Sequence, residues 1–203
     1  MRKIIVTQFM TLDGVVQAPG GPTEDTTGGF AYGGWSANYW DEMMGSVMGG
    51  FMGLPFELLL GKRTYDIFAA YWPNAKQDLE VANPFNSTKK YVVSHKSFEP
   101  AWRNSTCITG DVVAQIKKLK EENGPDLWIH GSANLIQTLL KHNLIDRMHL
   151  WIFPVTVGNG KRFFAEGTQA DGFKVIESRF ATTGVAILTC ESTGAIKTGT
   201  MGS

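Results

Sequence analysis

The sequence predicts an α/β fold of three layers, in which helices cover both faces of a mixed, mostly parallel sheet. Short apolar runs alternate with segments whose apolar residues recur at helical spacing, which is typical of parallel strands joined by helices. The last third carries two strand-like segments joined by a Thr-Thr-Gly turn, which indicates an antiparallel edge. The length, 203 residues, suits one well-packed domain better than two.

The elements follow from apolar runs in chain order. Strands that alternate with helices, and so imply parallel pairing, are expected at residues 4–6, 58–60, 91–93, 106–108 and 127–129, and a longer strand is expected at 147–157. A short helix is expected over 64–71, and Asp111 is placed to cap a second helix that ends at Gly124-Pro125. A third helix carries Leu135, Ile136, Leu139 and Leu140 on one face. The closing antiparallel pair is expected at residues 173–179 and 184–191.

Residues 43–61 carry almost no charge and are long enough for a membrane span. Pro55 and Glu57 interrupt the segment, and its glycines weaken an isolated helix. The segment is therefore expected to form a helix with one apolar face and then a buried strand. The N-terminus has no apolar signal core, so a cytoplasmic protein without a membrane anchor is expected.

Residues 18–34 form a long glycine-rich stretch, which we interpret as a loop that closes over a site. Residues 1–193 are expected to form the single domain, followed by a flexible tail at 194–203. Basic and acidic residues each number 19, and this balance argues against nucleic acid or an anionic membrane as a partner.

Metal and thiol chemistry find little support. The four histidines lack the spacing of a metal site, so no metal is expected. Cys107 and Cys190 are too few for a disulfide framework and are expected to be buried and inert. His130 ends a strand and is interpreted as a hydrogen-bonded structural histidine, with a place in the site as the alternative.

Three strand ends carry groups that suit an anion. They are Gly61-Lys62-Arg63-Thr64, Ser94-His95-Lys96 and Gly131-Ser132-Ala133-Asn134. Each combines small or hydroxyl residues with a helix start or a cation, which is how proteins bind phosphate. Each could also be an ordinary turn, with plain packing or solvated charges. Three such turns at the ends of strands in one sheet together predict a ligand with several phosphates, such as a dinucleotide.

The order of these motifs resembles the dihydrofolate reductase-like family, including the reductase domain of riboflavin biosynthesis. Residues 10–14 (MTLDG) resemble the S-L-D-G opening of the riboflavin reductases. Residues 58–65 (LLLGKRTY) and 90–94 (KYVVS) are similar to strands and turns of dihydrofolate reductase. Further matches are residues 127–135, 146–150 and 158–164. The resemblance implies a dihydrofolate reductase-like fold and NADPH as the hydride donor.

Transferred position by position, the resemblance implies which residues contact NADPH. Lys62, Arg63 and Thr64 would meet phosphates after Gly61, and Lys96 would meet the 2′-phosphate. Trp40 would lie on the nicotinamide side. The adenosine end would be held by Ser94 and His95, and the pyrophosphate by the helix start formed by Gly131, Ser132, Ala133, Asn134 and Leu135.

The catalytic candidates are Asp41 and Glu42, at the position where dihydrofolate reductase has its carboxylate. They could instead be ordinary acids at a helix start. The chain departs from the riboflavin reductases, because residues 65–72 lack their D-x-P-x-L-x-x-R stretch and Ile129 stands near their acid. The resemblance thus implies an NADPH-dependent reductase of a small nitrogen heterocycle of the pterin or aminopyrimidine class. The alternative is a catalytically silent nucleotide-binding protein.

A homodimer is also expected from the resemblance. The strand Trp151-Ile152-Phe153 could form its interface, or it could belong to the core.

Overall fold

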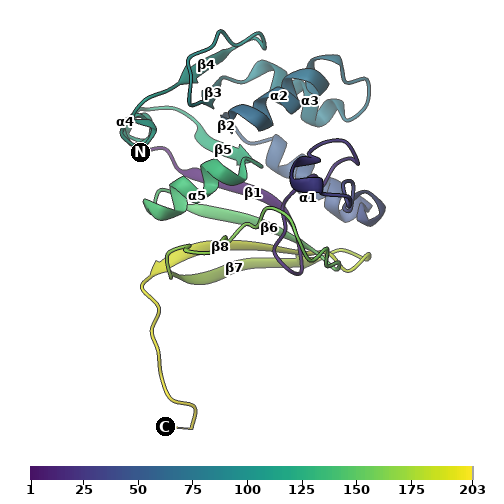
Figure 1. Ribbon diagram of the computed structural model, residues 1–203, viewed down its shortest axis with the longest axis vertical. Coiled ribbons are helices and arrows are strands. Elements are labelled where there is room, and N and C mark those ends of the chain that lie inside the picture. The colour runs from purple at the N-terminus through teal and green to yellow at the C-terminus, as the bar shows by residue number, and fades with distance from the viewer. Residues whose placement is uncertain (203) are drawn as a thin grey trace.

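The computed structural model describes residues 1–202, and within them eight strands form one sheet (Figure 1). The strand order across the sheet is β4-β3-β2-β5-β1-β6-β8-β7. The strands are β1 (Ile4–Thr11), β2 (Phe56–Gly61), β3 (Lys90–Val93), β4 (Ser105–Ile108), β5 (Asp126–His130), β6 (Arg147–Phe153), β7 (Gly172–Phe180) and β8 (Ala186–Gly194). The helices are α1 (Glu42–Met52), α2 (Lys62–Tyr71), α3 (Leu79–Ser87), α4 (Val112–Glu121) and α5 (Ala133–Lys141), with short 3₁₀ turns η1 (Thr27–Gly29), η2 (Ala37–Tyr39) and η3 (Trp72–Asn74).

In this sheet order, the first six strands, β4 through β6, pair in parallel with their neighbours. β8 and β7 then add an antiparallel edge. The structure thus confirms the predicted mixed sheet. β1 lies between β5 and β6, so that Val6 is flanked by Ile129 on one side and Met148 on the other. The carboxyl ends of the parallel strands therefore meet at one edge of the sheet.

Helices cover both faces of the parallel part, which gives three layers (Figure 1). α4 and α5 pack on the face that carries Ile4 and Val6, whereas α1, α2 and α3 pack on the face that carries Ile5. Neighbouring strand residues point to opposite faces, so an unbroken apolar strand serves both cores. Leu58, Leu59 and Leu60 follow this pattern, since all three are fully buried.

α1 buries the face that the sequence predicts. Met44, Val47, Met48 and Met52 are buried against the sheet, and Asp41 caps the helix by accepting a hydrogen bond from the Met44 backbone N–H. Within residues 1–202, every helix is too short or too polar to cross a membrane.

The structure corrects two expected element boundaries and adds one helix. β6 ends at Phe153 and does not continue to residue 157, because Pro154 follows and the chain turns there. α4 ends at Glu121, before Gly124-Pro125. α3 was not expected, because Pro84 lies inside it. Burial of Ala82 and Phe85 against the sheet holds this helix in spite of its proline.

The strand Trp151-Ile152-Phe153 belongs to the core. Trp151 and Phe153 are fully buried, and the strand lies inside the sheet between β1 and β8. It offers no free surface for a second chain. β8 extends to Gly194, one residue into the segment expected as a tail, and residues 195–202 contain no helix or strand. The last tail residue, Ser203, lies outside the described residues.

Candidate functional site

Two of the three predicted turns are in direct contact. β2 and β5 are neighbours, so the turn after Gly61 and the turn after His130 lie side by side. The Gly61 backbone N–H donates a hydrogen bond to Ser132 Oγ at 2.7 Å. A Cβ on Gly61 would lie only 3.2 Å from that oxygen, and one on Gly131 would lie 3.6 Å from Thr64 Oγ1. Glycine at position 61 permits the tight contact with Ser132, whereas the contact at Gly131 is an ordinary one and its left-handed backbone, φ 75°, is what favours glycine there.

This contact leaves the start of α5 without a side-chain cap. Ser132 occupies the cap position with a left-handed backbone, φ 71°, and its hydroxyl is engaged by Gly61 instead. The first backbone N–H groups of a helix have no acceptor within it, and they attract an anion. Asn134 is exposed, whereas the Leu135 side chain is buried in the core. Leu135 can therefore serve a ligand only through its backbone.

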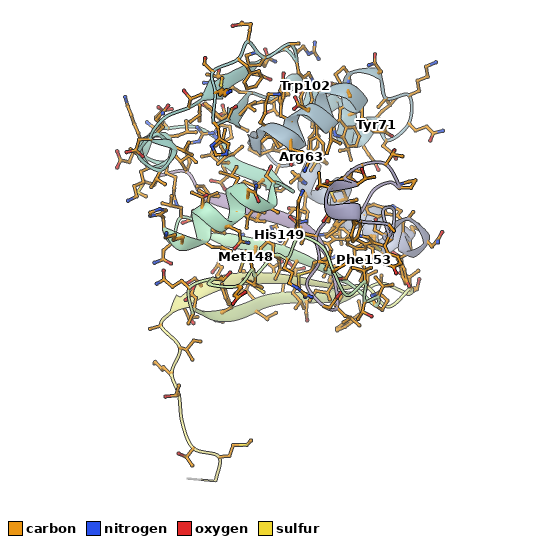
Figure 2. All side chains as sticks on the ribbon, viewed as in Figure 1. Arg63, Tyr71, Trp102, Met148, His149 and Phe153 are labelled. Atoms are coloured by element: carbon orange, nitrogen blue, oxygen red, sulfur yellow. The ribbon has the colours of Figure 1, made fainter. Side chains whose placement is uncertain are left out.

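The two cations of the turn after β2 both have partners. Lys62 contacts Asp66 at 2.6 Å and lies 4.6 Å from the centre of the Phe98 ring. Arg63, which projects from the start of α2 (Figure 2), contacts Asp25 at 3.3 Å and is 55% exposed. Arg63 also donates to Thr27 Oγ1 at 3.2 Å. The long loop at residues 18–34 therefore reaches the predicted phosphate site.

Asp25 bridges two cations that are far apart in the sequence. The Asp25 side chain is 9% exposed. Its Oδ2 contacts Lys161 Nζ at 2.5 Å, and its Oδ1 faces Arg63. Burial alone would raise the pKa of Asp25, but hydrogen bonds from Lys161 and Thr27 outweigh it and lower the pKa. The buried Gln17 amide holds the same loop through the carbonyls of Asp25 and Thr27. The loop is thus fastened across the edge of the sheet by a charged carboxylate.

The third turn, at residues 94–96, follows β3 and stays apart from the other two. The Ser94 backbone N–H donates to the Ile108 carbonyl, and the Lys96 N–H donates to Ser94 Oγ at 3.3 Å. His95 and Lys96 are exposed. The described residues show no hydrogen bond between this turn and the other two. Lys62 lies over the ring of Phe98, which follows this turn in the chain.

Trp40 and the two catalytic candidates lie at the start of α1. The Trp40 ring is stacked parallel to Trp151 at 5.8 Å and is 46% exposed. Asp41 accepts hydrogen bonds from the Met44 N–H at 2.9 Å and from the N–H and hydroxyl of Thr182, each at 2.8 Å. These bonds, that from Met44 first, lower the pKa of Asp41. Asp41 is therefore held as a carboxylate that joins α1 to the β7–β8 hairpin, while Glu42 is exposed.

A row of polar side chains crosses the sheet beneath α1. Thr7 is in register with His130 on β5 and with His149 on β6, and His149 is in register with Thr189. His149 Nδ1 lies 3.0 Å from Thr189 Oγ1, and the centre of the Phe51 ring lies 4.3 Å from the centre of the His149 ring. Sequence reasoning missed this row. Polar residues at in-register positions of neighbouring strands are its signal, but the register is known only from the fold.

The structure overturns the expectation that His130 is a hydrogen-bonded structural histidine. Within the described residues, His130 Nε2 and Thr7 Oγ1 are buried without a hydrogen-bond partner. Burial lowers the pKa of His130 to about 3, and burial followed by the charge of Arg147 lowers the pKa of His149 to about 4. Both rings are therefore neutral at pH 7. A buried unpaired polar atom is costly, and such atoms concentrate at functional sites.

Metal and thiol groups are sparse. Within residues 1–202, no three His, Cys, Asp or Glu side chains are grouped to hold a metal ion. Both cysteines are free. Cys190 is buried, which raises the pKa of its thiol, whereas Cys107 is only half-buried, in contrast to the expectation.

With this geometry in place, comparison with known proteins identifies the family. Residues 2–189 match the family model described as the RibD C-terminal domain. The chain belongs to this family. It is 28% identical over 187 residues to the uncharacterized protein YyaP of Bacillus subtilis (strain 168), covering 91% of this chain and 92% of YyaP. It is 27% identical over 112 residues to YwjB of the same organism, covering 55% and 60%.

Solved structures share the fold of this family. A riboflavin biosynthesis protein of Shewanella sp. PV-4 superposes with a TM-score of 0.67 at 22% identity, over 94% of this chain and 98% of that one. A pyrimidine reductase-like protein of Corynebacterium diphtheriae gives a TM-score of 0.61 at 10% identity, over 97% and 93%. At these identities the likeness concerns the dihydrofolate reductase-like fold.

The neutral histidines make stability depend on pH. The folded protein holds His130 and His149 well below the ordinary histidine pKa of 6.5, so the unfolded chain binds protons first. Stability is therefore expected to fall as the pH drops from about 6.5 toward 4, by up to about 1.4 kcal/mol per pH unit for each group. Urea unfolding at pH 7 and pH 5 measures the free energy of unfolding of the wild type and of His130→Leu. The variant should lose less stability between the two pH values than the wild type does. Exposed His142→Gln is the matched control, and equal losses in the wild type and His130→Leu would contradict the assignment.

Proposed function

We propose that this protein is an NADPH-dependent reductase of a small, flat, nitrogen-containing heterocycle. The observation that carries the proposal is the Gly61–Ser132 hydrogen bond, which joins the starts of α2 and α5 at the edge of the sheet and leaves α5 uncapped. A helix start that is free of its own cap, joined to a turn that carries two cations, is suited to a pyrophosphate. Membership of a family named for a riboflavin biosynthesis protein supports a reductase.

The residues present fit a phosphorylated dinucleotide. The N–H groups of Ala133, Asn134 and Leu135 would hold the pyrophosphate, with Thr64 beside them. Lys62 and Arg63 would add positive charge from the start of α2. The exposed turn of Ser94, His95 and Lys96 would meet the adenosine end, where Lys96 is the candidate for the 2′-phosphate.

When bound, NADPH would supply a hydride to a C=N or C=O bond of the substrate. The part of this chain is to orient both molecules and to provide the proton. Trp40 would flank the nicotinamide side, and its flat exposed ring can stack on another flat ring. Because Asp41 is engaged as a charged cap, Glu42 is the better candidate to deliver a proton, directly or through water.

Substrate choice rests on the family and on the buried row beneath α1. One solved structure of the same fold is described as pyrimidine reductase-like, which supports the pterin or aminopyrimidine class for this chain as well. Within the described residues, His130 Nε2 at the carboxyl end of β5 and Thr7 Oγ1 in the middle of β1 lack hydrogen-bond partners. Such atoms suit the ring nitrogens and exocyclic groups of a flat heterocycle that enters beside α1.

A second candidate function is a nucleotide-binding protein without catalytic activity. The observation that favours it is the environment of Asp41, whose lowered pKa is the opposite of what a proton donor at neutral pH requires. Consumption of NADPH with pterin or pyrimidine substrates, as against binding alone, distinguishes the two functions.

Cofactor choice is the direct test of the phosphate site. NADPH should bind at least about tenfold more tightly than NADH, a difference of roughly 1.4 kcal/mol, since only local cations can discriminate in a chain of zero net charge. Arg63→Ala should weaken NADPH binding, and Lys96→Ala should narrow the difference between the cofactors. Calorimetric titration of the wild type and both variants with each cofactor measures these affinities. Equal affinities for NADH and NADPH in the wild type would refute the assignment.

The Asp25 bridge should oppose cofactor binding. Its carboxylate neutralises Arg63 and Lys161, so Asp25→Asn should free positive charge and tighten NADPH several-fold, with a steeper dependence on salt. Glu24→Gln is the matched control, because it removes a charge from the same loop at a side chain that contacts the Gly20 N–H and no cation in the described structure. Weaker binding of NADPH to Asp25→Asn would show that the contacts of Asp25 with Arg63 and Lys161 instead hold the site in place.

The acid is tested by separating activity from stability. Glu42→Gln should lower turnover about a hundredfold with little effect on NADPH affinity or melting temperature. Asp41→Asn should lower the melting temperature, because it weakens the bonds to Met44 and Thr182. Steady-state kinetics and thermal unfolding of both variants give the comparison. Unchanged turnover in Glu42→Gln would remove Glu42 from the mechanism.

A further inference from the structure

The turn that joins β7 to β8 lies next to the start of α1 (Figure 1). It is the Thr-Thr-Gly turn of the sequence, and a hydrogen bond of 2.9 Å from the Ala181 N–H to the Val185 carbonyl closes its base. Ala181 and Val185 are buried in the same core cluster as Met44 of α1 and Trp151 of β6. The turn is therefore fixed to the core on the face of the sheet that carries α1.

Two consecutive threonines of this turn contact the chain just before α1. Thr182 donates hydrogen bonds from its N–H and its hydroxyl to Asp41 Oδ2, each at 2.8 Å. The Thr183 hydroxyl donates to the Tyr39 carbonyl at 2.6 Å. Residues 39 and 41 are the chain neighbours of Trp40. The two threonines therefore hold the chain on both sides of this one residue.

The position of the Trp40 ring depends on this hold. Trp40 links η2 to α1 with an extended backbone, φ −70° and ψ 131°. Its ring lies parallel to the fully buried Trp151 ring, with an interplanar angle of 5° and a centre-to-centre distance of 5.8 Å, and the Phe9 ring is 6.1 Å away. Stacked aromatic rings tolerate a range of offsets. Stacking therefore sets the tilt of the indole, whereas its place within that plane follows from where its backbone is held.

We propose that Thr182 and Thr183 are positioning residues, which hold the exposed Trp40 ring where a flat ring of the cofactor or substrate stacks on it. The identity of that flat ring rests on the proposed function, whereas the hold on Trp40 rests on the hydrogen bonds of the two threonines. Hydride transfer needs donor and acceptor carbon atoms in close alignment, and a displacement of about 1 Å can cost about a hundredfold in rate. The β7–β8 hairpin thus takes part in the site, although Thr182 follows Asp41 by 141 residues.

Fluorine NMR tests the hold on Trp40 without any ligand. The chain has six tryptophans, and in protein labelled with fluorotryptophan the variant Trp40→Phe identifies the Trp40 resonance. Thr182→Val and Thr183→Val remove the hydroxyls and keep the branched shape of the side chains. In the double variant T182V/T183V the Trp40 resonance should broaden or move toward the position of a free indole, and it should change less in each single variant. The remaining resonances should stay in place.

Steady-state kinetics with NADPH and a dihydropterin test the positioning role. The double variant should lower kcat about tenfold, with less than about a twofold change in KM for NADPH, because the proposed phosphate contacts lie at α2 and α5. Thr182→Ser and Thr183→Ser keep the hydroxyls and should retain most of the wild-type kcat. Thr168→Val is the matched control. It removes a hydroxyl that donates to the Ala165 carbonyl at 2.7 Å, in a turn beside the start of β6 and away from α1.

Circular dichroism and thermal unfolding establish that each variant is folded, and the single variants give the answer where the double variant does not fold. An unchanged Trp40 resonance would overturn the proposal, because stacking alone would then hold the ring. A changed resonance with an unchanged kcat would also overturn it, since the threonines would then serve the structure only. A wild type without turnover, combined with a changed resonance in the variants, would contradict the proposed function and uphold the hold on Trp40.

Discussion

The pairing of β2 with β5, fastened at its carboxyl end by the Gly61–Ser132 hydrogen bond, is the constraint on which the proposed site depends. Parallel pairing brings two strand ends together, and glycine at position 61 lets the Ser132 side chain approach the backbone closely. The same bond draws the Ser132 hydroxyl away from α5. One contact therefore sets the distance between two helix starts and leaves one of them open to an anion.

The positive charge at this edge comes from a few local side chains, because the net charge of the whole chain is zero. Arg63 and Lys161 face each other across the buried carboxylate of Asp25, which belongs to a loop rather than to the scaffold. A phosphate arriving at Arg63 would meet a cation that is already neutralised. In the proposed function, the position of the loop and the binding of an anion would thus be linked through a single carboxylate.

Sequence reasoning recovered what depends on local pattern and missed what depends on register. Strands such as residues 58–60 and the cap at Asp111 were predicted, because apolar runs and capping residues act within a few positions. α3 was missed because Pro84 argues against a helix that tertiary packing nevertheless holds. The partners of Asp25 and Asp41, Lys161 and Thr182, lie more than a hundred residues away and follow only from the fold.

The sheet order has a consequence for how this chain is made. β1 is synthesised before its neighbours in the sheet, β5 and β6, which begin at residues 126 and 147. Its apolar side chains have no native partner until more than half of the chain has been synthesised. Native pairing of β1 must therefore close a loop of over a hundred residues, which slows folding and prolongs the exposure of an aggregation-prone segment.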